Sequence, residues 1–329
     1  MKKLLALLVA LGSFSCTYNP LGDRDLRTAV GEPLGAGPAL EITYFGNSTL
    51  LISDGKTVLL VDGFFSRPGA LKTLFGRIGP NGRTLDKELR DIPRPDAVLV
   101  GHAHHDHALD ATEVAGRYDT MVIGSRAFAN LYQGSAGPEN GSQLKVIPAS
   151  GGTLPQIGEF IVHFAPSDHV IDYYFVQRII KADITGPLTM PARYYEFGCG
   201  DVFALHIHHP QGKVVITTTA GARQAQFAGR KADVVFLGVG LLTKESPEKQ
   251  ERYWKETVEV TNPDLIVPVH WDSFMRKLSK GLRPGLGESS KKLMDLVKAK
   301  AGSRRVRVLD VRESVRIQGG KVYCPEPRG

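Results

Sequence analysis

The feature that constrains this chain most is a short histidine-rich segment, GHAHHDH, at residues 101–107. It directly follows residues 95–100 (PDAVLV), a short apolar run rich in valine that predicts a buried strand. His102 and His104 leave the end of this strand two residues apart, so their imidazoles can reach one cation. The alternative is a histidine-rich surface loop without a ligand. The position directly after a buried strand favours a metal site.

Asp106 and His107 come four and five residues after His102, where the sequence turns into a helical pattern at residues 108–114. This offset lets one loop present ligands to two neighbouring metal positions. Zinc accepts histidine nitrogen at about 2.0–2.1 Å and carboxylate oxygen at about 2.0–2.2 Å, so ligands this close in sequence need only a tight turn to converge. His105 is expected to be a spacer that faces solvent or substrate.

Residues 102–107 match the pattern His-x-His-x-Asp-His, and at these residues the chain resembles the metallo-β-lactamase superfamily. It is most similar to the branch that holds N-acyl-phosphatidylethanolamine phospholipase D and the ascorbate-6-phosphate lactonases. The segments that carry this similarity are residues 42–52 (ITYFGNSTLLI), 58–62 (VLLVD), 96–110 and 268–272 (PVHWD). The resemblance implies an α/β fold, a four-layer αββα sandwich, with the metal loops at one edge of two sheets.

The resemblance also implies which side chains meet at that edge. His169 follows the strand-like residues 159–165, about where the family supplies the third histidine of its first metal. His270, within residues 268–272, matches the final ligand of the family. The expected ligands of the first metal are His102, His104 and His169, and those of a second position are Asp106, His107 and His270.

The expected cofactor is zinc, as one or two ions, with manganese or iron as alternatives. Zinc lowers the pKa of a bound water to about 7, so hydroxide is available at neutral pH. The resemblance implies attack of this hydroxide on a phosphodiester, ester or lactone, with Asp106 as the base that orients the nucleophile. Residues 40–62 predict a three-stranded meander that ends at Asp62. In the family this aspartate holds a histidine ring through its free nitrogen, whereas the alternative is a carboxylate that only ends the strand.

One position departs from the family pattern. Relatives end a later strand with Gly-Asp-Thr, whose aspartate bridges both metals, but residues 217–222 read TTTAGA here. Ala220 or a neighbouring threonine takes that place, and no acidic residue lies between Asp201 and Asp233. Loss of a shared anionic ligand should weaken the second metal. Thr219 could hydrogen-bond a metal-bound water. The departure leaves open a non-catalytic binding or assembly protein on a degraded metallo-hydrolase frame.

Two further features allow alternatives. His206 and His208 lie on one face of the strand-like residues 202–209, where they could add a metal ligand or line the cleft. Residues 170–200 resemble an insertion that is rich in aromatic side chains. It is either a lid over an apolar or acyl substrate or a packed subdomain, and the packed subdomain is preferred.

The N-terminus predicts export. Residues 1–16 have the positive start and short apolar centre of a secretory signal, and the small residue before Cys16 resembles a lipoprotein cleavage site. Residues 17–38, rich in glycine and proline, predict a tether. Residues 39–320 would then form one metallo-hydrolase domain, followed by a tail at residues 321–329. The expected location is periplasmic, or membrane-anchored through lipidated Cys16, in a bacterium.

The net charge and the cysteine content limit the classes of substrate and metal site that the sequence predicts. The net charge of +7 allows an anionic or phospholipid substrate, but no segment resembles a nucleic-acid module. The expected partner is therefore a small-molecule or lipid substrate, and the sequence does not indicate an oligomer. Cys199 and Cys324 could pair in an oxidising compartment. Neither belongs to a CxxC motif, so a thiolate zinc site is not expected.

Overall fold

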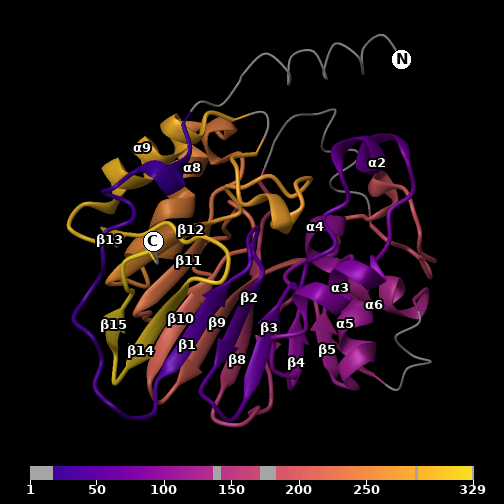
Figure 1. The fold of residues 1–329 in the computed structure, drawn as a ribbon, viewed down its shortest axis with the longest axis horizontal. Coiled ribbons are helices and arrows are strands. Elements are labelled where there is room, and N and C mark those ends of the chain that lie inside the picture. Colours follow the sequence, from indigo (N-terminus) through magenta and orange to yellow (C-terminus); the bar gives the residue numbers. More distant parts are fainter. Residues whose placement is uncertain (1–17, 136–141, 171–182, 286–287, 328–329) are drawn as a thin grey trace.

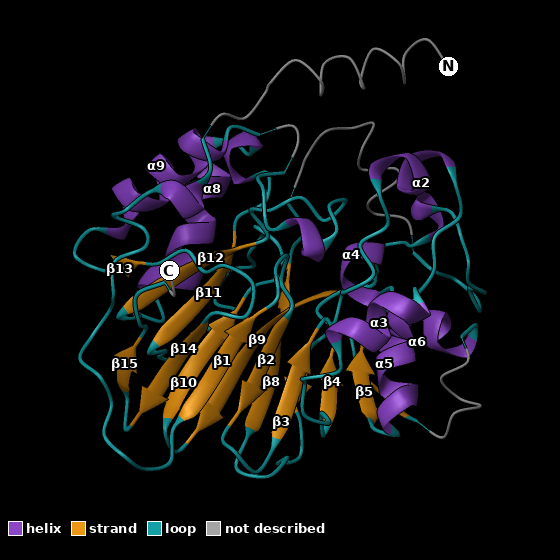
Figure 2. Ribbon diagram, viewed as in Figure 1, coloured by secondary structure: helices purple, strands orange, loops and turns teal. Residues whose placement is uncertain are grey.

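Two β-sheets packed against each other form the centre of the molecule, with helices on their outer sides (Figures 1 and 2). The computed structural model describes residues 18–135, 142–170, 183–285 and 288–327. The predicted α/β sandwich is confirmed. Residues 1–16, which carry the predicted signal and Cys16, lie outside the described part of the chain.

The sheets together contain fifteen described strands. In spatial order the first sheet contains β15 (Lys321–Tyr323), β14 (Ser314–Gln318), β1 (Leu40–Tyr44), β2 (Leu50–Ser53), β3 (Val58–Val61), β4 (Ala97–Leu99), β5 (Met121–Gly124) and β6 (Gln143–Val146). The second contains β13 (Arg305–Val306), β12 (Leu265–Val269), β11 (Val234–Gly238), β10 (Gly212–Ile216), β9 (Val202–His209), β8 (Ile161–Ser167) and β7 (Gly152–Thr153).

The helices lie toward the outer faces of these sheets, as Figure 2 shows. The α-helices are α2 (Ala70–Phe75), α3 (Gly82–Glu88), α4 (His105–Ala108), α5 (Ala111–Tyr118), α6 (Arg126–Gln133), α8 (Pro247–Trp254) and α9 (Ser290–Ala301). The chain continues from α8 into a π-helical turn, η4 (Lys255–Glu259), and the short 3-10 turns are η1 (Pro20–Gly22), η2 (Tyr194–Glu196), η3 (Leu242–Lys244) and η5 (Leu278–Lys280). Helices α5 and α6 contact strands of the first sheet, and α9 contacts β13 of the second.

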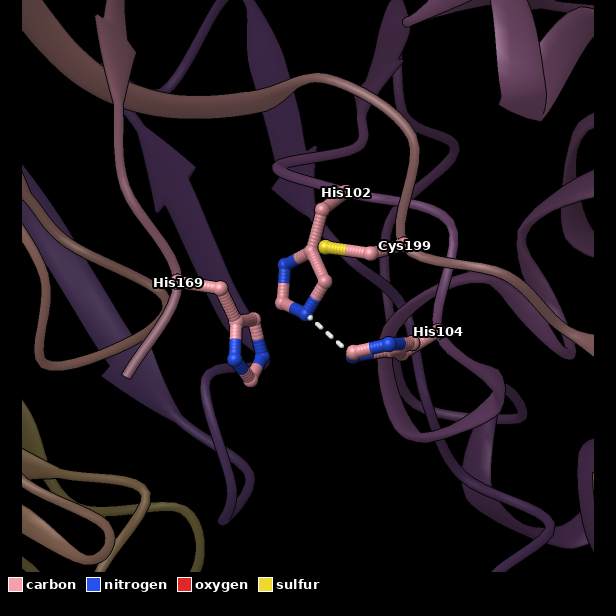
Figure 3. A group of neighbouring side chains, drawn as sticks. All are labelled: His102, His104, His169 and Cys199. Atoms are coloured by element: carbon pink, nitrogen blue, oxygen red, sulfur yellow. Dashed lines mark hydrogen bonds between the residues drawn. The ribbon is translucent and has the colours of Figure 1, made fainter. Parts of the chain in front are cut away.

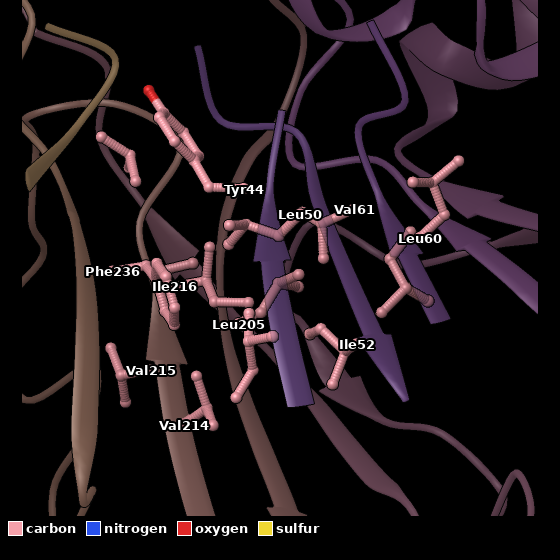
Figure 4. Close-up of a cluster of buried hydrophobic side chains, with 14 of the residues drawn as sticks. Tyr44, Leu50, Ile52, Leu60, Val61, Leu205, Val214, Val215, Ile216 and Phe236 are labelled. Atoms are coloured by element: carbon pink, nitrogen blue, oxygen red, sulfur yellow. The ribbon is translucent and has the colours of Figure 1, made fainter. Parts of the chain in front are cut away.

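The core lies between the two sheets. The predicted meander forms β1, β2 and β3, and its buried side chains meet those of β9, β10 and β11 (Figure 4). Ile52 from the first sheet and Leu205 and Phe236 from the second are fully buried. Burial of one such side chain stabilises the fold by about 1.5–3 kcal/mol. Packing of the two sheets against each other therefore fixes the positions of the strand ends that carry the polar residues.

Those strand ends meet at one edge of the sandwich. Strands β3 and β4 are parallel neighbours, so Asp62 and Gly101, which follow them, lie together. In the second sheet β8 ends two residues before His169, and β12 ends directly before His270. The carboxyl ends of parallel strands share one edge of a sheet, which is where α/β folds build their sites.

Three predictions about the ends of the domain and of its last strands are wrong. The segment predicted to be a tether packs on the domain, because Leu26 and Val30 are apolar and buried and Val30 pairs with Cys324. The predicted tail begins as strand β15, which extends the first sheet. Of the strand expected at residues 306–311, only Val306 lies in a strand, the two-residue β13. Among the described residues, none of the helices has the length and apolar character needed to cross a membrane.

Candidate metal centre

Four ligand-type side chains converge at the sheet edge, and they come from three separate parts of the chain. His102, His104, His169 and Cys199 each offer one ligand atom, and these atoms lie within 4.8 Å of one another. His102 Nε2 and His104 Nδ1 are 3.1 Å apart (Figure 3, dashed line). The Nδ1 of His169 lies 2.7 Å from the carbonyl oxygen of Val170, to which it donates. That hydrogen bond leaves Nε2 of His169 deprotonated and available to a cation.

A second group lies beside the first. Asp106, His107 and His270 also offer ligand atoms within 4.8 Å of one another. Asp106 Oδ2 is 3.3 Å from His107 Nε2 and 3.1 Å from His270 Nε2. The rings of His102 and His107 are 3.9 Å apart between centroids, so the two groups are adjacent. The five histidines that the sequence places at this site therefore surround one region.

Asp62 connects the strand ends to this second group. Its Oδ2 is 2.7 Å from His107 Nδ1 and accepts a hydrogen bond from Ser48 Oγ, while Oδ1 accepts from the backbone N–H of Gly101 at 2.9 Å. The contact with a histidine ring is the one that the sequence predicts for Asp62. Asp62 and His270 both have a left-handed backbone with φ of 58°. Such backbone strain is held by surrounding structure and is concentrated at functional sites.

The electrostatics of the two groups differ. Burial, followed by repulsion from His107 and the other nearby histidines, lowers the pKa of His102 well below its usual value, and burial also lowers the pKa of His169. Burial alone would lower the pKa of His107, but the charges of Asp106 and Asp62 raise it to about 10. Burial opposes ionisation of Asp106 as well, yet His107 and His270 hold its pKa well below the usual range. His102 and His169 are thus held in the neutral form, whereas Asp106 and His107 form an ion pair.

The donor chemistry fits a transition metal. Neutral imidazoles are the form that binds a cation, and a histidine whose other nitrogen is already hydrogen-bonded is oriented for ligation. His169 and His107 both meet that condition, through Val170 and Asp62. Nitrogen and sulfur donors suit zinc, whereas carboxylate added to imidazole also suits manganese or iron.

The structure also shows what replaces the bridging aspartate. Thr218 Oγ1 is 3.3 Å from His102 Nδ1, and Thr219 Oγ1 accepts a hydrogen bond from the backbone N–H of Val170 at 3.2 Å. Ala220 follows and is buried. Within the described chain, neither cluster of potential ligands contains a residue from this segment. Thr219 supports the loop that carries His169, and Thr218, which the sequence analysis did not identify, contacts His102.

Several other histidines lie elsewhere. His206 and His208 belong to neither group, and His206 Nε2 is 2.9 Å from the carbonyl oxygen of Lys231. Strand β9 begins at the site edge and runs away from it, so both are too far along the strand. His163 Nδ1 is 2.9 Å from Thr153 Oγ1, also outside the site. His105 is buried rather than facing solvent, because the rings of Tyr194, Phe197 and Phe274 surround it.

The predicted insertion packs on the domain where it is described. Ile184, Ala192 and Phe197 are buried, and Ala192 pairs with Ile78. This agrees with the packed subdomain for residues 183–200. Tyr173, Tyr174 and Phe175 of the predicted lid lie outside the described residues.

Two features of the site were not predicted from the sequence. Cys199 and Cys324 do not form a disulfide with each other, and Cys199 lies in the first group. Asp272 accepts hydrogen bonds from the backbone N–H of Asn47 at 2.7 Å and from Arg67, and Asn47 Nδ2 donates to the carbonyl oxygen of Asp106. The position of Asp272 in the motif PVHWD was a signal for such a role. Nothing in the spacing of Cys199 indicated its position.

Two stacked mixed sheets with histidine and aspartate groups at one edge define the metallo-hydrolase type of α/β sandwich. The chain belongs to the metallo-beta-lactamase superfamily, whose family model matches residues 42–270. It is 26% identical over 239 residues to a UPF0173 metal-dependent hydrolase of Lysinibacillus sphaericus (strain C3-41), which covers 71% of this chain and 86% of that relative. The chain is also 27% identical over 139 residues to a UPF0173 metal-dependent hydrolase of Anaeromyxobacter sp. (strain K). That alignment covers 42% of this chain and 46% of the relative.

A metallo-beta-lactamase fold protein from Bacillus subtilis has the same fold. Its crystal structure aligns with a TM-score of 0.52 at 15% identity and covers 85% of this chain and 100% of that one. At this identity the likeness concerns the fold alone.

Proposed function

We propose that this protein is an exported metal-dependent hydrolase that acts on a phosphodiester, lactone or ester bond. The observation that carries the proposal is the convergence of two adjacent groups of ligand-type side chains at the edge of the sandwich. Its relatives in the superfamily are named metal-dependent hydrolases, which supports the same reaction class. A metal bound there would polarise the scissile bond and lower the pKa of an attacking water.

The residues divide into three roles. His102, His104 and His169 hold the first metal, and Asp106, His107 and His270 form the second position. Zinc is the proposed metal, as one or two ions, with manganese or iron as alternatives. Asp62 orients His107 by the hydrogen bond at Nδ1.

Asp106 is the proposed base that orients the nucleophile. Its low pKa keeps the carboxylate ionised at neutral pH, so it can accept a hydrogen bond from the attacking water and orient it. The backbone at Asp106 is held by Asn47, whose amide donates to its carbonyl oxygen at 2.7 Å. The carboxylate therefore stays between the rings of His107 and His270.

The proposed substrate is a small molecule or a lipid. Residues 42–52 and the motif at 268–272 resemble the phospholipase D and lactonase branch, which supports phosphodiester or lactone chemistry. The net charge of +7 is compatible with an anionic substrate. The sequence carries no motif of a nucleic-acid-binding module, so a nucleic-acid substrate is not part of the proposal.

Export and lipid attachment at Cys16 belong to the same proposal. Their support is the positively charged start and the apolar run in residues 1–16. Fractionation of bacteria that produce the full chain should place it in the periplasm or the membrane fraction. A Cys16→Ala variant should leave the membrane fraction, and a wild type found only in the cytosol would contradict the proposal.

The decisive experiment measures metal and turnover on the same preparation. The purified protein should contain one or two transition metals per chain and hydrolyse at least one member of a panel of phosphodiesters, lactones and esters. His104→Ala should lose both metal and turnover. The matched control is His163→Ala, because His163 lies in strand β8 outside both groups. An active metal-free preparation would contradict the proposal, and tight ligand retention without any turnover would support the non-catalytic binding protein instead.

A further inference from the structure

We propose that Cys199 supplies a fourth ligand, a thiolate, to the metal that His102, His104 and His169 hold. This inference rests on the proposed function, because it concerns the same metal centre. Cys199 is 4% exposed, and its sulfur lies within 4.8 Å of the ligand nitrogen of each of the three histidines. Figure 3 shows the sulfur pointing toward His102, with the rings of His104 and His169 around the same space.

The backbone around Cys199 is built into the metal loop. Its carbonyl oxygen accepts a hydrogen bond from the N–H of Ala103 at 3.1 Å, between the first two histidines. A second bond, from Phe203 N to the Gly101 carbonyl at 2.9 Å, ties the same two segments together. The next residue, Gly200, has φ of 60°, and a Cβ there would lie 2.2 Å from Ala127 Cβ. These contacts hold the thiol at the site independently of any metal.

Among the described residues, the first group contains no anionic ligand apart from the thiol of Cys199. Imidazole binds a cation in its neutral form, and within the described chain no carboxylate belongs to this group. The bridging aspartate of the family is absent, since the segment reads TTTAGA and Ala220 is buried. A thiolate would supply the missing anion, with its proton released to solvent as the metal binds.

Three nitrogens and one sulfur are donors that zinc binds, and because zinc can expand to five ligands, a position remains for the water of the proposed hydrolysis. Such a set would bind the first ion without the shared carboxylate. The second group has Asp106 as its acidic ligand but lacks the shared carboxylate of the family, so it would provide the more weakly held position. The alternative is a small buried thiol that only fills space.

Cobalt(II) tests the sulfur–metal bond directly, because a thiolate ligand adds a charge-transfer absorption in the near ultraviolet. We expect this band in the cobalt-loaded full-length wild type and its loss in Cys199→Ala. Cys324→Ala is the matched control, because Cys324 is also a buried cysteine outside any disulfide and follows the end of β15. Loss of a hydrogen-bond partner behind a ligand costs about 10–100-fold in metal affinity, so loss of Cys199 itself should weaken zinc at least about tenfold in a chelator competition.

A second variant leaves the site untouched. In Cys16→Ala/Cys324→Ala the only remaining cysteine is Cys199, so the band must persist even if Cys199→Ala fails to fold. Cobalt bound without the band, or unchanged zinc affinity in folded Cys199→Ala, would overturn the role of Cys199 and leave the proposed hydrolase standing. A wild type that binds no cobalt or zinc would overturn both.

Discussion

The buried ion pair between Arg67 and Asp272 should be the polar contact on which the second ligand group depends most. Their side chains are 1% and 0% exposed, and Arg67 Nη1 lies 2.6 Å from Asp272 Oδ2. Asp272 Oδ1 accepts hydrogen bonds from Tyr44 Oη at 2.9 Å and from the N–H of Asn47. The carbonyl of Asn47 in turn accepts from the N–H of His270 at 2.6 Å. Breaking the ion pair should therefore disturb the second ligand group, because Asn47 connects Asp272 to His270.

The size of the effect follows from what remains after each substitution. Removal of one partner from a buried ion pair costs about 3–5 kcal/mol of unfolding free energy. Arg67→Met leaves Asp272 with its bonds from Tyr44 and Asn47, so we expect the low end, about 3 kcal/mol. Asp272→Asn leaves a buried guanidinium whose remaining bond is 3.3 Å long, to the carbonyl of Ser273, so we expect about 5 kcal/mol. The double variant buries no charge and should recover at least about 2 kcal/mol of the summed losses.

Urea unfolding of chelator-treated protein measures these values without a contribution from metal binding. The control is Lys291→Met, which breaks an exposed ion pair with Asp295, the side chains being 64% and 52% exposed. That loss should stay below about 0.5 kcal/mol. A cost below about 1 kcal/mol for Arg67→Met, or additive losses in the double variant, would refute the reasoning.

Two further predictions concern metal and protons. Metal-free protein should lose unfolding free energy as pH rises from 6.5 through about 10, because the folded state binds the proton on His107 more tightly than the unfolded state does. Urea titrations across that range should show the slope, and Asp62→Asn should reduce it; a slope that Asp62→Asn leaves unchanged would assign the effect to other groups. Ala220→Asp restores a carboxylate at the position of the family's bridge, so equilibrium dialysis should find a higher zinc content than in the wild type. An unchanged content would show that Ala220 is not the bridging position.

The sequence alone determined the frame and much of the site. Short apolar runs followed by polar residues predicted the meander and the strands that end at Asp62 and His102, because strand propensity and alternation are local properties of the chain. The spacing of the histidine motif depends on a single turn, so the metal loop was also readable. His169 and His270 became readable only through resemblance to a family, since no local pattern links them to His102.

Tertiary structure decided what depends on contacts between distant segments. Cys199 reaches the first ligand group because residues 199–203 run along the metal loop. No local pattern in the 96 residues between His102 and Cys199 indicates that contact. His206 has the spacing of a ligand but lies too far down β9, since β8 and β9 pair in a register set by burial. Composition likewise predicted a tether where buried Leu26 joins the core. Local pattern determines which elements form, whereas packing of the two sheets determines which side chains meet.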